Sequence, residues 1–390
     1  MAPPQQPEQN AEREGPERPP TRLDADEVRD VLRAHGVTGL RAARALHGGN
    51  PRSPKAWAET DAGTLLIKRH PPEASDASRV EQSRRAARAA DRAGVPIARA
   101  LRPIEDAGGT DRAFVRGGAV YEVFAFVEGQ RYSGTRAEAA DAARVLATLH
   151  AGLDEMGGEP PGRAADTPRA DLGLLVRVLH DQGLAEDTAV AASLERLESD
   201  RSRADAALRG GAAGEPDRGE GPPRPQGPLH GDYHPGNLIY RGGRVAAVLD
   251  FGSIRVGPRA AELAAACLHL ALIRRGPDPA GWPVAPDAGL LAAAWGAYTG
   301  AAWGGIGAAP PWAGPHRAPW RMIESIIEET VMRVAAGAPV GSVRYAARVT
   351  AWLCEHADGI GAVLSEATET APEHPSGAGP ETGSPSVEGD

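Results

Sequence analysis

The chain has 390 residues, of which 41% are hydrophobic and 24% are charged. This composition is typical of a globular protein, and the length is sufficient for two parts with separate cores. No apolar run approaches the roughly 20 residues that a membrane-spanning helix needs, and residues 1–20 lack the apolar stretch of a signal peptide. We therefore expect a cytoplasmic protein that does not bind membranes.

The formal net charge is −9. Residues 366–390 hold six acidic and no basic side chains, so they contribute −6 and leave −3 for the rest of the chain. A nucleic-acid-binding domain usually carries a basic face. We therefore expect no nucleic-acid partner, whereas the charge says nothing about a small substrate.

Composition separates folded from disordered segments. Stretches rich in Pro, Gly, Ser and charged residues are predicted to be disordered, and they comprise 1–22, an insertion at 199–227 and the acidic tail at 366–390. The folded chain then has two parts, 23–127 and 128–365.

Residues 23–127 are predicted to form an antiparallel sheet with one long helix. A short amphipathic helix begins at Asp24, with Glu27 at the position of its capping-box partner. Glycines at 63 and at 117–118 favour hairpin turns. The predicted strands are 40–46, 56–60, 64–69, 99–104, 112–116 and 119–127, and the long helix is 73–93.

Residues 128–365 are predicted to be mostly helical. The predicted helices are 135–151, 170–182, 187–198, 258–275, 287–300, 317–336 and 342–364. One hairpin interrupts this pattern, because the strand-like segments 238–240 and 245–251 flank an Arg-Gly-Gly turn.

A polar motif surrounds this hairpin, where residues 229–252 read LHGDYHPGNLIYRGGRVAAVLDFG. Asp232 lies in a tight loop, Asn237 directly precedes the first strand, and Asp250 ends the second. Pairing of the hairpin therefore brings Asn237 and Asp250 to neighbouring positions. Carboxylate and amide oxygens suit Mg²⁺, and phosphoryl transfer needs metal ligands and a base near the acceptor hydroxyl. The spacing indicates one metal-phosphate site.

The segments HGDYHPGNLIY and VLDFG resemble the catalytic and metal-binding segments of the aminoglycoside phosphotransferase family. These proteins are also called choline and homoserine kinase-like small-molecule kinases, and they are similar to protein kinases. The resemblance implies an α+β, protein kinase-like two-lobed fold. Residues 23–127 would be the nucleotide-binding lobe, and 128–365 would be the helical catalytic and substrate lobe.

The resemblance also implies roles for the residues of the motif. Asp232 would be the catalytic base or would orient the acceptor hydroxyl, and His230 would brace the loop by hydrogen bonding to backbone. Asn237 and Asp250 would hold Mg²⁺. Glu262 stands where the family usually shows an aspartate that supports the catalytic loop.

A kinase-like fold needs a lysine on its third strand, and Lys68 stands there. By itself Lys68 is also compatible with a strand-edge lysine in solvent, but the downstream motif favours the phosphate-binding role. Its partner should be an acid of the following helix. Glu81 is the candidate, and Glu73 is the competitor at the predicted start of the helix.

Two more segments are candidates for nucleotide binding. The turn after the first strand contains Gly48, Gly49 and Asn50, whose backbone N–H groups are candidates for phosphate contact, although a glycine pair is also common in simple turns. Adenine would pair with backbone groups in the lobe connector, around residues Phe124, Phe126 and Val127. We expect the two phenylalanine side chains to be in the core.

The acceptor is less well defined. His234 replaces the lysine that protein kinases commonly place two residues after the base, and no A-P-E segment follows DFG, so a small hydroxyl-bearing molecule is favoured over protein. Glu324, Glu328 and Glu329 are compatible with binding a cationic amine, but a solvated acidic face is favoured. We interpret His150 and His269 as structural.

The sequence therefore predicts an O-phosphotransferase that uses ATP or GTP with Mg²⁺. Its acceptor would be an aminoglycoside, another antibiotic, a sugar or an amino alcohol, and an antibiotic acceptor would imply a role in antibiotic resistance. A metabolic kinase of the homoserine or choline type would share the same residues. A protein kinase and a non-catalytic pseudokinase are weaker alternatives. The sequence does not define the oligomeric state.

Overall fold

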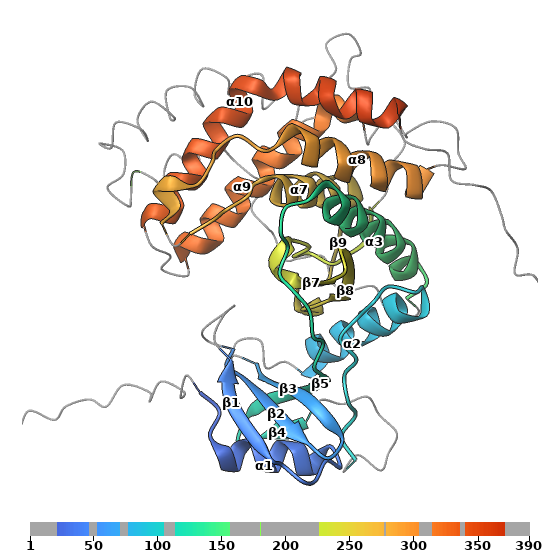
Figure 1. Cartoon of the computed structure of the whole chain (residues 1–390), viewed down its shortest axis with the longest axis vertical. Coiled ribbons are helices and arrows are strands. Elements are labelled where there is room, and N and C mark those ends of the chain that lie inside the picture. Colours follow the sequence, from blue (N-terminus) through green and yellow to red (C-terminus); the bar gives the residue numbers. More distant parts are fainter. Residues whose placement is uncertain are drawn as a thin grey trace, which may run out of the picture. The chain divides into compact units, whose positions relative to one another are not determined.

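The computed structural model describes residues 22–46, 53–70, 77–104, 114–156, 180, 226–276, 278–303, 314–335 and 340–370 (Figure 1). The chain divides into two compact units. The first unit comprises Met1–Ala77 and Arg99–Phe126, and the second comprises Ser78–Ala98 and Val127–Asp390. The chain thus passes from the first unit to the second at Phe126, next to the predicted boundary.

The first unit contains a five-stranded antiparallel sheet with strand order β1-β2-β3-β5-β4. Buried and half-buried residues alternate along β2 and β3, which is the period expected of strands with one face in a core. The predicted antiparallel sheet is thus confirmed. The strands are β1 (Ala42–Leu46), β2 (Lys55–Thr60), β3 (Gly63–Arg69), β4 (Phe114–Arg116) and β5 (Ala119–Ala125).

Helix α1 (Ala25–Ala34) packs its apolar face on this sheet. Asp24 and Glu27 form the predicted capping box. Glu27 also accepts hydrogen bonds from the guanidinium of Arg69 at 2.8 Å and from the hydroxyl of Tyr121. Burial, followed by the neighbouring Glu27, raises the pKa of Tyr121 to about 12. This buried network fixes α1 to the middle of the sheet.

The predicted strand at 99–104 is wrong. Only Ala100 forms a bridge, to Phe124, although the N–H of Leu101 donates to the carbonyl of Val123 at 2.7 Å. Pro103 has no N–H to donate, so a regular ladder ends before it.

The second unit is mostly helical, and Figure 1 shows its two short antiparallel sheets close to α3 and α7. Its α-helices are α2 (Ala77–Arg92), α3 (Arg136–Asp154), α7 (Arg259–Ala271), α8 (Ala288–Trp303), α9 (Ala318–Ala335) and α10 (Val340–Glu369). Strand β6 (Gln226–Leu229) pairs with β9 (Arg255–Pro258), and β7 (Leu238–Arg241) pairs with β8 (Arg244–Val248). Short 3₁₀ turns are η2 (Pro235–Asn237), η3 (Phe251–Ser253), η4 (Pro279–Gly281) and η6 (Pro315–Arg317).

The long helix predicted at 73–93 belongs to the second unit, not to the nucleotide-binding part in which the sequence placed it. Ala86 and Ala90 on α2, and Val95 just after it, are buried in the core of the second unit. A pattern of alanines shows that a helix has a buried face, but it does not show which core receives that face.

Some predicted segments differ at their ends or lie outside the described residues. Strand β6 begins at Gln226, within the predicted insertion, and α10 continues to Glu369, within the predicted acidic tail. The predicted helices 170–182 and 187–198 lie outside the described residues, apart from His180. Among the helices that the structure describes, each is too short or too polar to cross a bilayer.

Candidate active site

The loop between β6 and β7 carries the central part of the polar motif. Gly231 has a φ of +81°, and a β-carbon there would collide with the carbonyl oxygen of Ser253, so this position requires glycine. The ring of His230 is fully buried. Its Nε2–H donates to the carbonyl of Leu249 at 3.0 Å, and its Nδ1 accepts from the backbone N–H of Asp232 at 3.3 Å. His230 thus makes the hydrogen bonds to backbone that its predicted bracing role requires.

Burial lowers the pKa of His230 despite the nearby carboxylate of Glu262. The neutral ring has one donor and one acceptor nitrogen, which is what its two backbone contacts require. A protonated ring would lose the bond from Asp232. The loop geometry therefore depends on a neutral histidine.

Glu262 of α7 lies buried beneath the same loop. Its carboxylate accepts from the backbone N–H groups of His230 at 3.1 Å and Gly231 at 2.5 Å, and from Nε2 of His150 at 2.7 Å. Burial by itself would raise the pKa of Glu262, but the hydrogen bond and charge of His150 hold it below its ordinary value. Glutamate therefore supports the loop at this position, where the family usually shows aspartate.

His150 has a larger part in the site than the sequence indicated. It lies on α3, and its Nδ1 contacts the hydroxyl of Tyr298 at 2.7 Å while its Nε2 contacts Glu262. Its structural role is as predicted, but its partner was missed because 112 residues separate the two side chains along the chain. For the contact with Glu262, the sequence offered only the signal of a histidine at the end of an apolar helix.

The hairpin brings Asn237 and Asp250 together as expected. Leu238 pairs with Val248, and the N–H of Leu249 donates to the carbonyl of Asn237 at 2.9 Å. Asp250 follows directly, with a left-handed φ of 58° that no other non-glycine residue shows in the described part of the chain. Left-handed backbone is unfavourable for residues with a β-carbon and is characteristic of functional sites.

Asp232 joins this pair through a side-chain contact. The amide nitrogen of Asn237 donates to the carbonyl and to Oδ2 of Asp232, both at 2.9 Å. This orientation leaves the amide oxygen of Asn237 as its group for a cation. Asp250 is exposed and directly follows Leu249, whose N–H donates to the carbonyl of Asn237. Amide and carboxylate oxygens are ligands that suit Mg²⁺. Asn237 and Asp250 are thus the residues suited to hold a metal.

The structure describes only some of the predicted nucleotide-binding residues. Lys68 lies half-buried on β3, opposite Glu122 of β5, within the first unit. Glu81 is exposed on α2 in the second unit, so its pairing with Lys68 stays a prediction. The residues Gly48, Gly49 and Asn50, and the competing Glu73, lie outside the described residues.

The prediction that Phe124 and Phe126 are core side chains is wrong. Both are half-buried, and neither is part of the core cluster of the first unit. Phe126 ends the first unit, and Val127, also half-buried, begins the second segment of the second unit. Adenine contact by these three residues stays a prediction.

The acidic set on α9 is not the solvated face that the sequence favoured. Glu324 forms an ion pair with Arg321, and Glu329 lies 3.7 Å from Nε2 of His269. Burial, followed by the charge of Glu324, raises the pKa of Glu328 to about 7, although Arg255 and Arg321 oppose this shift. These side chains are half-buried because α9 packs against α7, and arginines neutralise part of their charge.

An antiparallel sheet carrying a lysine strand, and a helical unit carrying the H-G-D-x-x-x-x-N and D-F segments, define a kinase-like protein. The family described as "phosphotransferase enzyme family" matches residues 46–309, which is more than half of the chain. The chain belongs to this family, and it is therefore a phosphotransferase.

Solved structures agree on the fold. An aminoglycoside phosphotransferase from Alicyclobacillus acidocaldarius subsp. acidocaldarius DSM 446 is 18% identical, with 84% of this chain and 92% of that chain covered and a TM-score of 0.52. A spectinomycin phosphotransferase, in complex with ADP and spectinomycin, is 12% identical over 86% and 99% of the chains, with a TM-score of 0.53. An amicoumacin kinase, in complex with AMP-PNP and Ca²⁺, is 11% identical over 90% and 95%, with a TM-score of 0.53. No curated protein matches the chain in sequence.

The buried carboxylate of Glu262 should be essential to the stability of the loop. We expect Glu262→Gln to lower the free energy of unfolding by about 2–4 kcal/mol, because the amide loses the charge and one acceptor oxygen. Urea unfolding measures this effect. The exposed Glu155→Gln is the control, and a wild-type midpoint for Glu262→Gln would show that the loop does not depend on this carboxylate.

Glu328 should make stability depend on pH. Between its ordinary pKa of 4.5 and its raised value of about 7, the folded protein keeps a proton that the unfolded chain has lost. Stability therefore falls as pH rises through this window. We expect Glu328→Gln to be about 1–3 kcal/mol more stable than wild type at pH 8 and nearly equal to it at pH 4.5. Urea unfolding at both pH values measures this, with the exposed Glu366→Gln as control; an equal difference at both values would contradict it.

Proposed function

We propose that this phosphotransferase transfers the γ-phosphoryl group of ATP or GTP to a hydroxyl of a small molecule, with Mg²⁺. The observation that carries the proposal is the contact of Asp232 with Asn237, next to the strained Asp250, on a loop braced by His230 and Glu262. The acceptor would be an antibiotic, a sugar or an amino alcohol, and the enzyme would act in the cytoplasm, where nucleoside triphosphates are found.

Asp232 would act on the acceptor hydroxyl. The Asn237 amide fixes its Oδ2, and its Oδ1 lies 3.5 Å from Nε2 of His234. Half of the Asp232 side-chain surface is exposed, so a hydroxyl has access to this side chain. As the acceptor oxygen bonds to the γ-phosphorus, the bond from that phosphorus to the bridging oxygen breaks. Asp232 then accepts the hydroxyl proton, and the nucleoside diphosphate leaves.

Asn237 and Asp250 would hold Mg²⁺ at the end of the β7–β8 hairpin. When bound there, Mg²⁺ neutralises charge on the transferring phosphates. Lys68 would bind the nucleotide phosphates and Glu81 would orient Lys68. Gly48, Gly49 and Asn50 would contact phosphate through backbone N–H groups, and the backbone around Phe124, Phe126 and Val127 would contact adenine.

A small-molecule acceptor is favoured over a protein by the segment after the metal aspartate. Residue Ile254 and the short strand β9 (Arg255–Pro258) are all that separate η3 from α7. This chain therefore has no long segment after D-F-G that would present a peptide. His234 also leaves no lysine two residues after the base.

Removal of the base should slow transfer without weakening nucleotide binding. We expect Asp232→Asn to lower kcat by about 10²–10⁴-fold, because the amide cannot accept the hydroxyl proton. The KM for the nucleotide should stay at the wild-type value. The measurement is coupled ADP or GDP release with a panel of hydroxyl acceptors. Full activity of Asp232→Asn would contradict the assignment of the base.

Removal of the metal carboxylate should have a different signature. We expect Asp250→Ala to abolish Mg²⁺-dependent binding of a non-hydrolysable nucleotide, because the exposed carboxylate oxygen is lost. Calorimetric titration with and without Mg²⁺ measures this. Any nucleotide binding that persists without Mg²⁺ should have the same affinity in Asp250→Ala and in wild type. Wild-type affinity with Mg²⁺ would rule out a metal role for Asp250.

A further inference from the structure

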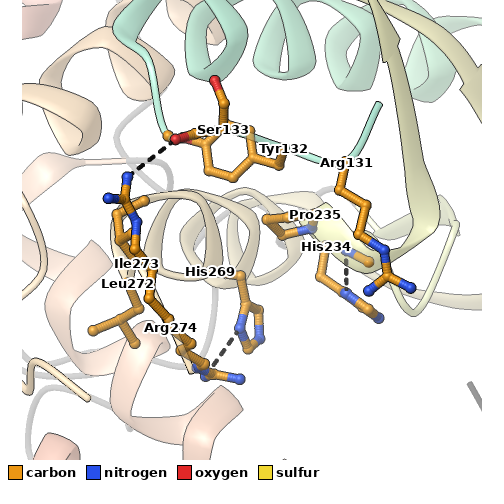
Figure 2. Close-up of a pocket in the computed structure, with 12 residues that line it drawn as sticks. Arg131, Tyr132, Ser133, His234, Pro235, His269, Leu272, Ile273 and Arg274 are labelled. Carbon is orange, nitrogen blue, oxygen red and sulfur yellow. Dashed lines mark hydrogen bonds between the residues drawn. The ribbon is translucent and has the colours of Figure 1, made fainter. Parts of the chain in front are cut away.

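A cavity of about 280 Å³ lies in the second unit beside the catalytic loop (Figure 2). Three segments line it: residues 131–134 before α3, residues 234–236 of the loop, and residues 269 and 272–275 around the end of α7. The volume is close to the lower end for ligand pockets, about 300 Å³. The cavity therefore has room for a compound the size of one sugar.

One residue that lines the cavity also contacts the proposed base. His234 lines it, and Nε2 of His234 lies 3.5 Å from Oδ1 of Asp232. Nδ1 of the same ring accepts from the backbone N–H of Gly236 at 3.0 Å, so the ring is fixed by the loop itself. A molecule in the cavity would thus lie next to the imidazole that contacts the carboxylate of Asp232.

The lining is basic. Among the described residues that line the cavity there are three arginines, Arg131, Arg274 and Arg275, two histidines and no carboxylate. No described carboxylate pairs with Arg131 or Arg275. The guanidinium of Arg275 lies 3.5 Å from the carbonyl of Ser133, and the dashed line to Ser133 in Figure 2 marks this contact.

Arg274 is held in place but is not fully satisfied. It lies over the rings of Trp282 and Tyr345, at 6.0 and 5.4 Å from their centroids. One guanidinium nitrogen lies 3.9 Å from the carboxylate of Glu329. Nδ1 of His269 accepts from another at 3.5 Å (Figure 2). Its Nε is buried and has no hydrogen-bond partner among the described residues. Glu329 therefore offsets part of the positive charge of Arg274. The three arginines still give the cavity lining an excess of positive charge.

We infer that this cavity binds an oxyanion of the acceptor, a carboxylate or a phosphate, and that the acceptor is therefore a small anionic hydroxyl compound rather than a cationic amine. The inference rests on the proposed function for the identity of the bound molecule. Planar guanidinium groups suit both oxyanions through paired N–H donors. The acidic residues of α9 do not supply a matching cation site, because Arg321 forms an ion pair with Glu324 and burial raises the pKa of Glu328 to about 7.

Four compounds with one six-carbon skeleton test the sign of the charge: gluconate, glucose 6-phosphate, glucose and glucosamine. Each is titrated calorimetrically into the full chain with saturating Mg²⁺ and AMP-PNP, so that nucleotide phosphate sites are filled. We expect gluconate, glucose 6-phosphate or both to bind at least tenfold more tightly than glucose, and glucosamine to bind most weakly. The two anions distinguish a carboxylate from a phosphate ligand.

Substitutions of the cavity arginines test whether the anion binds in this cavity. Arg274→Gln/Arg275→Gln should weaken anion binding about tenfold or more and leave glucose binding and nucleotide affinity unchanged, since each lost charged hydrogen bond is worth about a factor of ten. Arg275→Gln alone, at an exposed position, serves if the double variant fails to fold. The exposed Arg144→Gln is the matched control.

Three results would overturn the inference: tighter binding of glucosamine than of gluconate, no binding of either anion, or anion binding that the arginine variants do not change. A rise in the KM for the nucleotide alone would also overturn it, because the arginines would then serve the donor. ADP release is measured separately with all four compounds. Anion binding without release of ADP from any compound would keep the anion site and contradict the proposed transfer.

Discussion

The buried carboxylate of Glu262 is the interaction on which the rest of the site depends. It accepts two backbone N–H groups of the catalytic loop and one imidazole N–H from α3. A buried carboxylate is stable only when hydrogen-bond donors surround it, and here three donors do so. The positions of α3 and α7 therefore set the shape of the loop, and His230 extends the same network to the backbone next to Asp250.

Helix α9 and strand β9 add a second support to this loop. Arg255 of β9 donates to the carbonyl of Gly231 at 3.3 Å. Its positive charge also opposes the rise that burial causes in the pKa of Glu328. The next residue of α9, Glu329, is directed to His269 and Arg274 at the wall of the cavity. Two adjacent glutamates thus serve different partners, one near the base of the loop and one behind the basic cavity.

Local features of the fold and site were predictable from the sequence, because their causes are local. The hairpin turn at residues 61–63 and the Asn237 to Asp250 hairpin follow from glycine positions and strand periodicity, and the structure contains both. Contacts between distant segments were not predictable. The link from His150 to Glu262, the core that receives α2, and the burial of Glu328 each depend on which helices pack together, and residue types alone do not specify that packing.

The left-handed backbone of Asp250 has a consequence for how this enzyme would decay in evolution. Such a conformation costs of order 1–3 kcal/mol, and glycine would adopt it without that cost. The residue suited to hold the metal is thus one at which the folded state stores strain. Replacement of Asp250 by glycine would relax the backbone while it removed a carboxylate oxygen. An inactive descendant of this protein would accordingly persist as a well-folded chain, and selection for stability alone would not preserve the aspartate.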